Sequence, residues 1–222
     1  HSPHVIVSEW VDGVPLSRII AEGTAQERDL ASELYLDFLV TAPERARMLH
    51  ADPHPGNFRL TPEGRLGVLD FGAVNRLPRG LPPALGELVS YALAGDAVAV
   101  ARGLQTEGFI KASLPIEPEA LLAYLTPFID PLRREWFTFS RPWMRSVAVH
   151  VQDPRKPEFL VGLKLNLPPE YLLIHRVWVG GIGVLCQLGG TVRGRDIVLG
   201  ALPGVAPELL PPPLPEPAPE SR

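Results

Sequence analysis

Apolar residues recur at helical spacing over long parts of this chain. Between Gln26 and Leu49 they follow the period of an amphipathic helix, and Pro43 is expected to break that helix near its end. The apolar members are Leu30, Leu34, Leu36, Phe38 and Leu39. Further amphipathic helices are predicted over residues 81–104 and 118–129, with Gly, Pro and Asp as breakers. The pattern therefore predicts a mainly helical chain.

Two short apolar runs interrupt this helical pattern. Residues 58–60 and 66–69 flank the segment Thr61-Pro62-Glu63-Gly64-Arg65. In such a segment Pro pre-sets φ and Gly permits a positive φ, which is typical of a turn between two strands. The predicted hairpin would bring Asn57 and Asp70, the residues on its two sides, close together.

The longest apolar stretch runs from Tyr171 to Leu188 and contains His175, Arg176 and Gln187. A helix that crosses a bilayer needs about 20 mostly apolar residues. We therefore expect this stretch to be too short and too polar to span a membrane, and to form a buried helix with close packing at its glycines.

Candidate chemistry is concentrated in the run His50-Ala51-Asp52-Pro53-His54-Pro55-Gly56-Asn57 and in Asp70-Phe71-Gly72. Asp52 and Asn57 have the spacing of the Asp and Asn in the kinase catalytic loop H-R-D-x-x-x-x-N, and a D-F-G triplet follows, as in kinases. In phosphoryl transfer the protein mainly positions the acceptor and neutralises charge on the phosphates.

The residue types suit these tasks. The Asp70 carboxylate and the Asn57 amide supply the hard oxygen ligands that Mg²⁺ prefers. Asp52 would accept the hydroxyl proton or orient the acceptor. A metal site formed by His50, Asp52 and His54 is an alternative, although zinc hydrolases usually carry His at helical spacing or Cys pairs. We expect His50 to pack beneath Asp52.

Residues 50–58 and 69–74 resemble the catalytic and metal loops of the UbiB-type (AarF-like) atypical kinases, in which the run Asp-Pro-His-Pro-Gly-Asn is distinctive. Residues 5–16 are similar to the hinge between the two lobes of that family. Residues 167–171 and 184–188 resemble its terminal C-lobe helices. The likeness covers most of the chain before residue 200 and is strongest over the two loops.

The resemblance implies an α+β, mainly helical fold: a protein-kinase-like C-lobe with a short hinge strand and a catalytic-loop hairpin. The lobe would span residues 1–202, with the hinge at 4–13, the catalytic loop at 50–57 and the D-F-G triplet at 70–72.

The resemblance also implies ATP and Mg²⁺ as cofactors. Asp52 would be the catalytic residue, and Asn57 and Asp70 would hold the metal and the nucleotide phosphates. The backbone near Glu9, Trp10 and Val11 would seat the adenine.

An N-lobe with a phosphate-pairing lysine is part of the same resemblance. Lys111, Lys156 and Lys164 all follow Asp70, whereas that lysine precedes the catalytic loop in kinase folds. We therefore expect a C-lobe fragment, with the N-lobe absent, that is inactive alone. The full-length protein would be a kinase or ATPase that supports quinone or isoprenoid-lipid metabolism. A small-molecule phosphotransferase of the aminoglycoside type, with its similar loop, and a non-catalytic scaffold are the alternatives.

Charge and cysteine content limit the partners and the cellular compartment that can be expected for this protein. The net charge of −4 and the pI of about 5.9 argue against a broad nucleic-acid surface. Cys186, the single cysteine, cannot form an internal disulfide and is expected to be a small core residue. These features are consistent with a cytoplasmic protein.

The sequence also predicts the structure of two further segments. Residues 203–222 contain eight prolines and are predicted to be extended or disordered, with Pro212-Pro213-Leu214-Pro215 matching P-x-x-P. Residues 133–145 interleave Arg with aromatic residues and are expected to form a helix pair whose core holds Trp136, Phe139 and Trp143. A peripheral membrane contact is the alternative for this second segment, and the acceptor of the phosphoryl group could then be a lipid.

Overall fold

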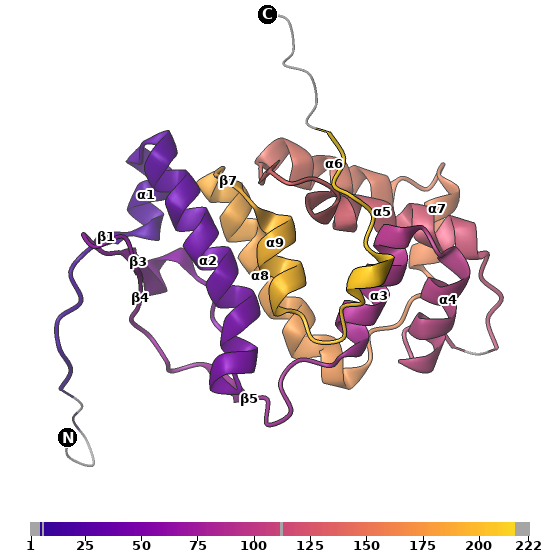
Figure 1. The fold of residues 1–222 in the computed structure, drawn as a ribbon, viewed down its shortest axis with the longest axis horizontal. Helices are drawn as coiled ribbons and strands as arrows, with labels where there is room; N and C mark the ends of the chain where they lie inside the picture. The colour runs from indigo at the N-terminus through magenta and orange to yellow at the C-terminus, as the bar shows by residue number, and fades with distance from the viewer. Residues whose placement is uncertain (1–4, 6, 112, 216–222) are drawn as a thin grey trace, which may run out of the picture.

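The computed structural model describes all residues except 1–4, 6, 112 and 216–222. Helices make up most of the fold, and the described strands are short and form small sheets (Figure 1). In chain order the elements are β1 (Val14–Pro15), α1 (Leu16–Glu22), α2 (Ala25–Ala46), β2 (Met48–His50), η1 (Pro55–Asn57), β3 (Phe58–Leu60), β4 (Leu66–Val68), β5 (Val74–Arg76), α3 (Ala84–Ala94), α4 (Ala97–Thr106), α5 (Pro118–Arg133), β6 (Phe137–Thr138), α6 (Arg141–Gln152), α7 (Pro157–Gly162), α8 (Pro169–Leu188), β7 (Thr191–Val192), α9 (Gly194–Ala201) and η2 (Pro207–Leu209).

Helix α2 begins with a capping box. Thr24 Oγ1 accepts a hydrogen bond from Glu27 N, and Glu27 Oε2 accepts one from Thr24 N. The prediction that Pro43 breaks this helix is wrong, because α2 continues through it to Ala46. Pro43 lies in the last turn and is buried, so the helix loses one N–H at a position where core packing holds the chain in place.

The predicted helical region 81–104 contains two helices, α3 and α4. Gly95, with φ 77°, ends α3, and the Asp96 side chain accepts a hydrogen bond from Ala99 N at the start of α4. The region predicted over 118–129 extends further, since α5 runs through Pro127 and Pro131 to residue 133.

The hairpin between Asn57 and Asp70 is present as predicted. Strands β3 and β4 pair antiparallel with Phe58 opposite Val68 and Leu60 opposite Leu66, and β1 adds to the edge of β3. A second antiparallel pair, β2 with β5, was not predicted.

Two hydrophobic clusters form the core. The larger one lies between α1, α2, α8 and α9, with Tyr35, Phe58 and Leu185 fully buried in it. The smaller one joins α3, α4, α5 and α7 around Val100 and Leu121. In Figure 1, α8 and α9 lie between α2 on one side and the group α3 to α7 on the other.

Helix α8 corrects one expectation and supports another. It has 20 residues, and it is long and apolar enough to cross a membrane by length and composition, so the stretch is not too short. Within the described chain, however, its Val177, Leu185 and Leu188 are buried in the larger cluster. The close packing expected at its glycines occurs at Gly181, where an added Cβ would lie 2.4 Å from Leu39 Cδ1.

The helix pair predicted over residues 133–145 is not found. Residue 133 ends α5, residues 137–138 form strand β6 against β7, and α6 begins at residue 141. Phe139 is buried and Trp143 half-buried, but Trp136 is 40% exposed, with the Arg193 guanidinium 5.7 Å from its ring centroid. Pairing with β7 holds this segment extended, which leaves Trp136 outside the core.

Residues 203–215, which we call the C-terminal strap, were predicted to be extended or disordered, and in the structure they contact α3 and α5 and are without helix or strand apart from the short helix η2. The rest of the predicted tail, residues 216–222, lies outside the described residues. Ala206 N donates to Ser90 Oγ on α3, and Leu214 N donates to Arg133 O at the end of α5. Among the described residues of the strap, backbone hydrogen bonds within it occur at the short helix η2, because its prolines lack N–H donors, and helices α3 and α5 supply further partners.

Candidate functional site

The two candidate loops are held side by side by backbone hydrogen bonds. The pairing of β2 with β5 sets His50 opposite Val74, and Ala51 N donates to Ala73 O at 2.8 Å. On the other side of the hairpin, Leu69 N donates to Asn57 O at 2.9 Å. The segment that carries Asp52 and the segment that carries Asp70 are therefore fixed against each other at both ends.

Asp52 and Asn57 are in direct contact. The Asn57 Nδ2 amide donates to Asp52 Oδ2 at 2.7 Å and is 3.3 Å from Asp52 O. This bond orients the amide, so that its oxygen, Oδ1, points away from Asp52. Among the described residues, Oδ1 has no hydrogen-bond donor and can accept from a cation.

Asp70 is exposed at the start of the loop before β5. Its Oδ1 accepts from Gly72 N at 2.7 Å, which leaves Oδ2 for another partner. Its backbone oxygen lies 2.6 Å from His50 Nε2. His50 is only 6% exposed, and its ring lies 5.3 Å from that of Phe58 and 6.0 Å from that of Phe71. His50 therefore packs beneath the loops, as expected.

These residues match the coordination preferences of Mg²⁺ better than those of zinc. Magnesium keeps several waters and binds one or two protein carboxylate or amide oxygens together with substrate phosphates. Asn57 Oδ1 and Asp70 Oδ2 fit that donor set. Within the described residues, no group of three or more His, Cys, Asp or Glu side chains could hold a metal ion, so His50, Asp52 and His54 do not form such a site.

The predicted adenine-seating segment lies beside the hairpin. Glu9 and Trp10 are exposed, Trp10 by 76%, and Val11 is half-buried. Arg59 Nη1 lies 3.5 Å from Val11 O and 3.4 Å from Gly13 O, and its guanidinium is 5.4 Å from the centroid of the Trp10 ring. Arg59 thus links the hinge to β3, directly after Asn57 and Phe58.

Two residues around these loops, Arg59 and Tyr35, were not predicted from the sequence. Arg59 could have been noticed as a charged residue within a short apolar strand. Tyr35 gave no signal beyond its place in α2, yet its hydroxyl donates to Pro53 O at 2.7 Å and thereby supports the loop that carries Asp52. Burial, and secondly the nearby Asp52 carboxylate, raises the pKa of Tyr35, which keeps the hydroxyl protonated as a donor.

Comparison with known proteins gives consistent relatives. A family model described as "ABC1 atypical kinase-like domain" matches residues 1–104. The protein ACTIVITY OF BC1 COMPLEX KINASE 3, chloroplastic, of Arabidopsis thaliana is 29% identical over 187 residues, 79% of this chain and 24% of that protein. An aarF domain-containing protein kinase, chloroplastic, of the same plant is 31% identical over 178 residues, 78% of this chain and 22% of its own length.

A solved structure shares the fold. The structure of Rv3197 from Mycobacterium tuberculosis, solved in complex with erythromycin, superposes with a TM-score of 0.80 at 31% identity. The match covers 89% of this chain and 49% of that one. The chain therefore spans about a quarter of the curated relatives described above and about half of this structural neighbour.

Proposed function

This chain belongs to the UbiB-type, AarF-like family of atypical kinases, and on that premise we propose that it is the C-terminal lobe of an ATP- and Mg²⁺-dependent kinase or ATPase. The lobe would span residues 1–202, and the strap contacts α3 and the end of α5. The observation that carries the proposal is the contact between Asp52 and Asn57 beside the Asp70 loop.

Each of the three side chains has a distinct task in this proposal. Asn57 Oδ1 and Asp70 Oδ2 would hold Mg²⁺, which when bound neutralises charge on the nucleotide phosphates. The bond from Asn57 Nδ2 keeps one Asp52 oxygen occupied and aims the carboxylate. The second Asp52 oxygen is then available to accept the proton of the acceptor hydroxyl or to orient that hydroxyl.

Two supporting residues keep this arrangement rigid. Tyr35 fixes the backbone at Pro53, next to Asp52, and His50 fixes the backbone oxygen of Asp70. Rigid placement of reacting groups lowers the entropic cost of reaching the transition state. The backbone of residues 9–11 would seat the adenine, positioned relative to β3 by Arg59.

For the acceptor of the phosphoryl group we propose a metabolic class. Support of quinone or isoprenoid-lipid metabolism is proposed from the family, and a peripheral membrane contact through residues 133–145 is compatible with the exposure of Trp136. Flotation with anionic liposomes at low salt tests that contact, and failure to float would remove it.

A small-molecule phosphotransferase is the second candidate function. One observation favours it: the neighbour with the same fold was solved with erythromycin, a small molecule. The two candidates share Asp52, Asn57 and Asp70 and differ in the acceptor. A non-catalytic scaffold is the third candidate, and it predicts no nucleotide turnover at all.

The deciding experiment uses a longer protein that includes the sequence encoded upstream of His1. The DNA upstream of the codon for His1 is sequenced, and the protein that includes any N-lobe encoded there is expressed. We expect Mg²⁺-dependent ATP consumption by that protein and little or no nucleotide-induced thermal shift by the present chain alone. An upstream stop codon with a native start, or an extended protein that does not consume ATP, would contradict the enzyme proposal and favour the scaffold.

A further inference from the structure

A cavity of about 510 Å³ lies next to the segment that follows β5. We call it the post-β5 cavity. One wall is the segment Leu77–Pro83, and the other is formed by the end of α4, at Thr106 and Glu107, and the start of α8, at Glu170, Tyr171 and Ile174. Small-molecule sites usually have volumes of roughly 300–1,000 Å³, so the size is suitable for a ligand.

The wall of the post-β5 cavity is fixed in place. Leu77 N donates to Arg47 O at 2.9 Å, and Leu81 N donates to Glu44 Oε1 at 2.6 Å, so both ends are tied to the end of α2. Gly80 between them has φ 72°, and an added Cβ would lie 2.1 Å from Glu44 Oε1. A ligand would therefore meet a preformed surface and would not have to order a loop.

One of the two carboxylates that line this cavity, Glu107, accepts a hydrogen bond from a buried tyrosine. Tyr171 is 4% exposed, its ring lies 4.7 Å from that of Phe109, and its hydroxyl donates to Glu107 Oε2 at 2.5 Å. Burial raises the pKa of Tyr171, and the Glu107 hydrogen bond and the charges of Glu107 and Glu170 raise it further. Glu107 and Glu170 both line the cavity that Tyr171 also lines.

The carboxylates are not neutralised by the protein. Within the described residues neither Glu107 nor Glu170 forms an ion pair, although the Arg79 side chain also lines the cavity. Two carboxylates and one guanidinium leave a formal charge of −1. The remaining lining is largely apolar and rigid: Leu77, Pro78, Leu81, Pro82, Pro83 and Ile174.

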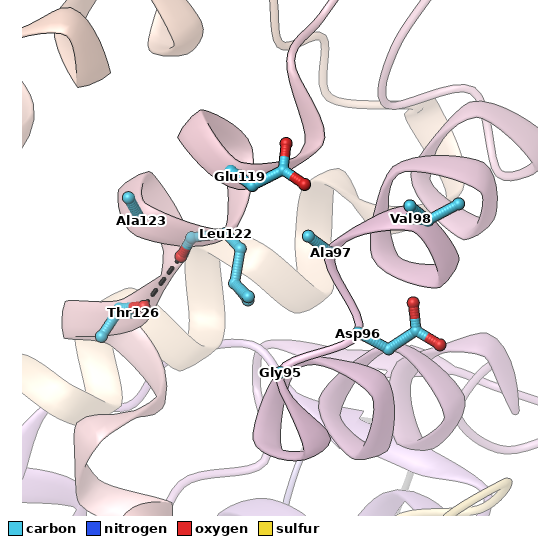
Figure 2. A pocket seen from close by; sticks show the side chains of 8 residues that line it. All are labelled: Gly95, Asp96, Ala97, Val98, Glu119, Leu122, Ala123 and Thr126. Atoms are coloured by element: carbon cyan, nitrogen blue, oxygen red, sulfur yellow. Dashed lines mark hydrogen bonds between the residues drawn. The ribbon is translucent and has the colours of Figure 1, made fainter.

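A second cavity of similar volume provides a contrast (Figure 2). Its carboxylates belong to Asp96 and Glu119, and Asp96 is already used to cap α4 through Ala99 N. Its other lining side chains, Ala97, Val98, Leu122, Ala123 and Thr126, include no buried aromatic hydroxyl, and Thr126 Oγ1 donates to Leu122 O in its own helix. Glu119 therefore offers a matched control.

We infer that the post-β5 cavity binds an organic cation, an ammonium or guanidinium group carried on an apolar body. The cation would contact Glu107, which is half-buried, and Glu170, which is exposed, through charge-assisted hydrogen bonds, and such bonds are stronger than neutral ones. The apolar body would contact the prolines and Ile174. This binding depends on no step of phosphoryl transfer, so it stands or falls separately from the proposed function.

The test uses 4-phenylbutylamine as the probe and 4-phenylbutan-1-ol as its uncharged counterpart. Both are titrated against the whole 222-residue chain by NMR, following the signals of Leu77–Pro83 and Tyr171. We expect the amine to bind about tenfold more tightly than the alcohol, because hydrogen bonds to charged groups contribute about that ratio. Equal affinities, or no binding of the amine at millimolar concentration, would overturn the inference.

Variants identify the groups responsible. In Glu107→Gln/Glu170→Gln the amine should bind no better than the alcohol, since Gln keeps an acceptor for Tyr171 but removes the charge. Glu170→Gln alone, at an exposed position that leaves the Tyr171 hydrogen bond intact, should lose severalfold in affinity. Glu119→Gln should bind like the parent chain. Amine binding that survives the double substitution, or that Glu119→Gln abolishes equally, would contradict the assignment.

Discussion

At the scale of single residues, the candidate site depends on where hydrogen bonds leave free oxygen atoms. Asn57 gives its amide N–H to Asp52, and Asp70 gives one oxygen to Gly72 N. Asn57 and Asp70 each thereby keep one oxygen free for a cation, and hydrogen bonds fix the positions of all three side chains. The chemistry is therefore set by orientation as much as by residue type.

Substitution of Asp52 tests its role directly. In the upstream-extended protein, Asp52→Asn should lower ATP turnover by about 10²–10⁴-fold, the usual contribution of a positioned acid or base. Its melting temperature should stay close to that of the parent, because Asp52 is exposed. The control is Asp130→Asn, which removes only the exposed pair with Arg133. Full turnover by Asp52→Asn would remove Asp52 from the mechanism.

Cys186 gives a pH-dependent prediction. Burial raises the pKa of its thiol from 9.0 to about 11. The folded thiol therefore keeps its proton where the unfolded thiol loses it, so its contribution to stability is complete below about pH 9 and is lost as the pH rises toward 11. The free energy of unfolding should fall over this range more steeply for the parent than for Cys186→Ala, as measured with urea. Parallel pH profiles would contradict this.

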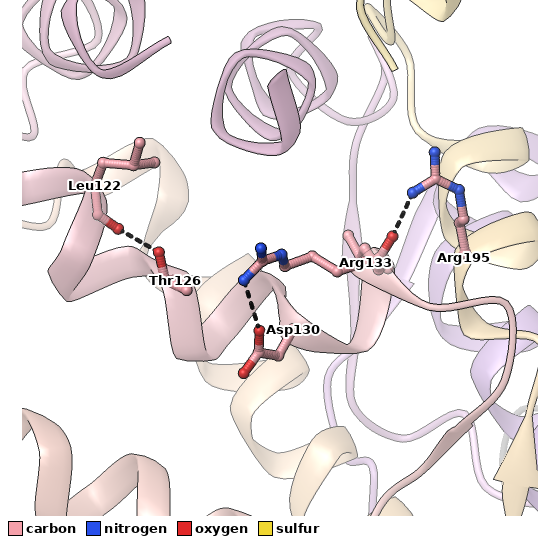
Figure 3. Close-up of polar contacts among 6 residues, drawn as sticks. Leu122, Thr126, Asp130, Arg133 and Arg195 are labelled. Carbon is pink, nitrogen blue, oxygen red and sulfur yellow. Dashed lines mark hydrogen bonds and ion pairs between the residues drawn. The ribbon is translucent and has the colours of Figure 1, made fainter. Parts of the chain in front are cut away.

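At the scale of elements, single buried side chains connect segments that the local sequence leaves independent. Arg195 on α9 is 9% exposed and donates to Leu132 O at 2.7 Å and to Pro211 O at 2.5 Å. Figure 3 shows its guanidinium reaching the end of α5, next to the pair formed by Arg133 and Asp130. One charged side chain thereby holds α9, α5 and the C-terminal strap together.

Loss of this contact should be costly. Arg195→Met keeps most of the side-chain volume but leaves two carbonyl groups without their donor, which typically costs about 1–3 kcal/mol per buried group. We expect urea unfolding to show a loss of that order. The matched control, Arg193→Met, removes an exposed cation from the Trp136 ring and should cost below about 1 kcal/mol. Equal losses in both variants would contradict the assigned role of Arg195.

At the scale of the whole molecule, the strap bridges two hydrophobic clusters. It leaves α9 beside the larger cluster, passes α3 through Ser90 and ends on Arg133 and Arg134, next to the smaller one. Close packing supports this path, since an added Cβ on Gly86 would lie 2.2 Å from Pro203 O. The strap therefore couples the two halves of the lobe.

Truncation tests this coupling. A chain that ends at Leu202 should unfold at a lower urea concentration, and the smaller cluster should lose its amide-exchange protection first, because α3 loses the hydrogen bond from Ala206 N and the end of α5 loses the one from Leu214 N. A chain that ends at Pro215 retains every strap contact described above and should behave like the parent. Equal stability of the two truncated chains would show that the strap contributes nothing.

The sequence by itself determined the local parts of this protein. Spacing selected Asp52, Asn57 and Asp70 as candidates, turn residues predicted the hairpin between the last two, apolar periodicity predicted α2, and a long apolar stretch predicted most of α8. These features depend on residues close together in the chain, whose φ/ψ preferences and side-chain period act over a few positions. At Pro43 the local signal met stronger packing forces, and the predicted break of the helix is absent.

Only the tertiary structure decided how these parts meet. The pairing of β2 with β5, the support of Pro53 by Tyr35 and the anchoring of the strap by Arg195 join residues far apart in sequence. The cavity between residues 77–83, the end of α4 and the start of α8 likewise needs segments that are far apart in the sequence. Such contacts form because buried polar groups must find partners and apolar surfaces must be covered, and the partner is whichever group the completed fold brings near.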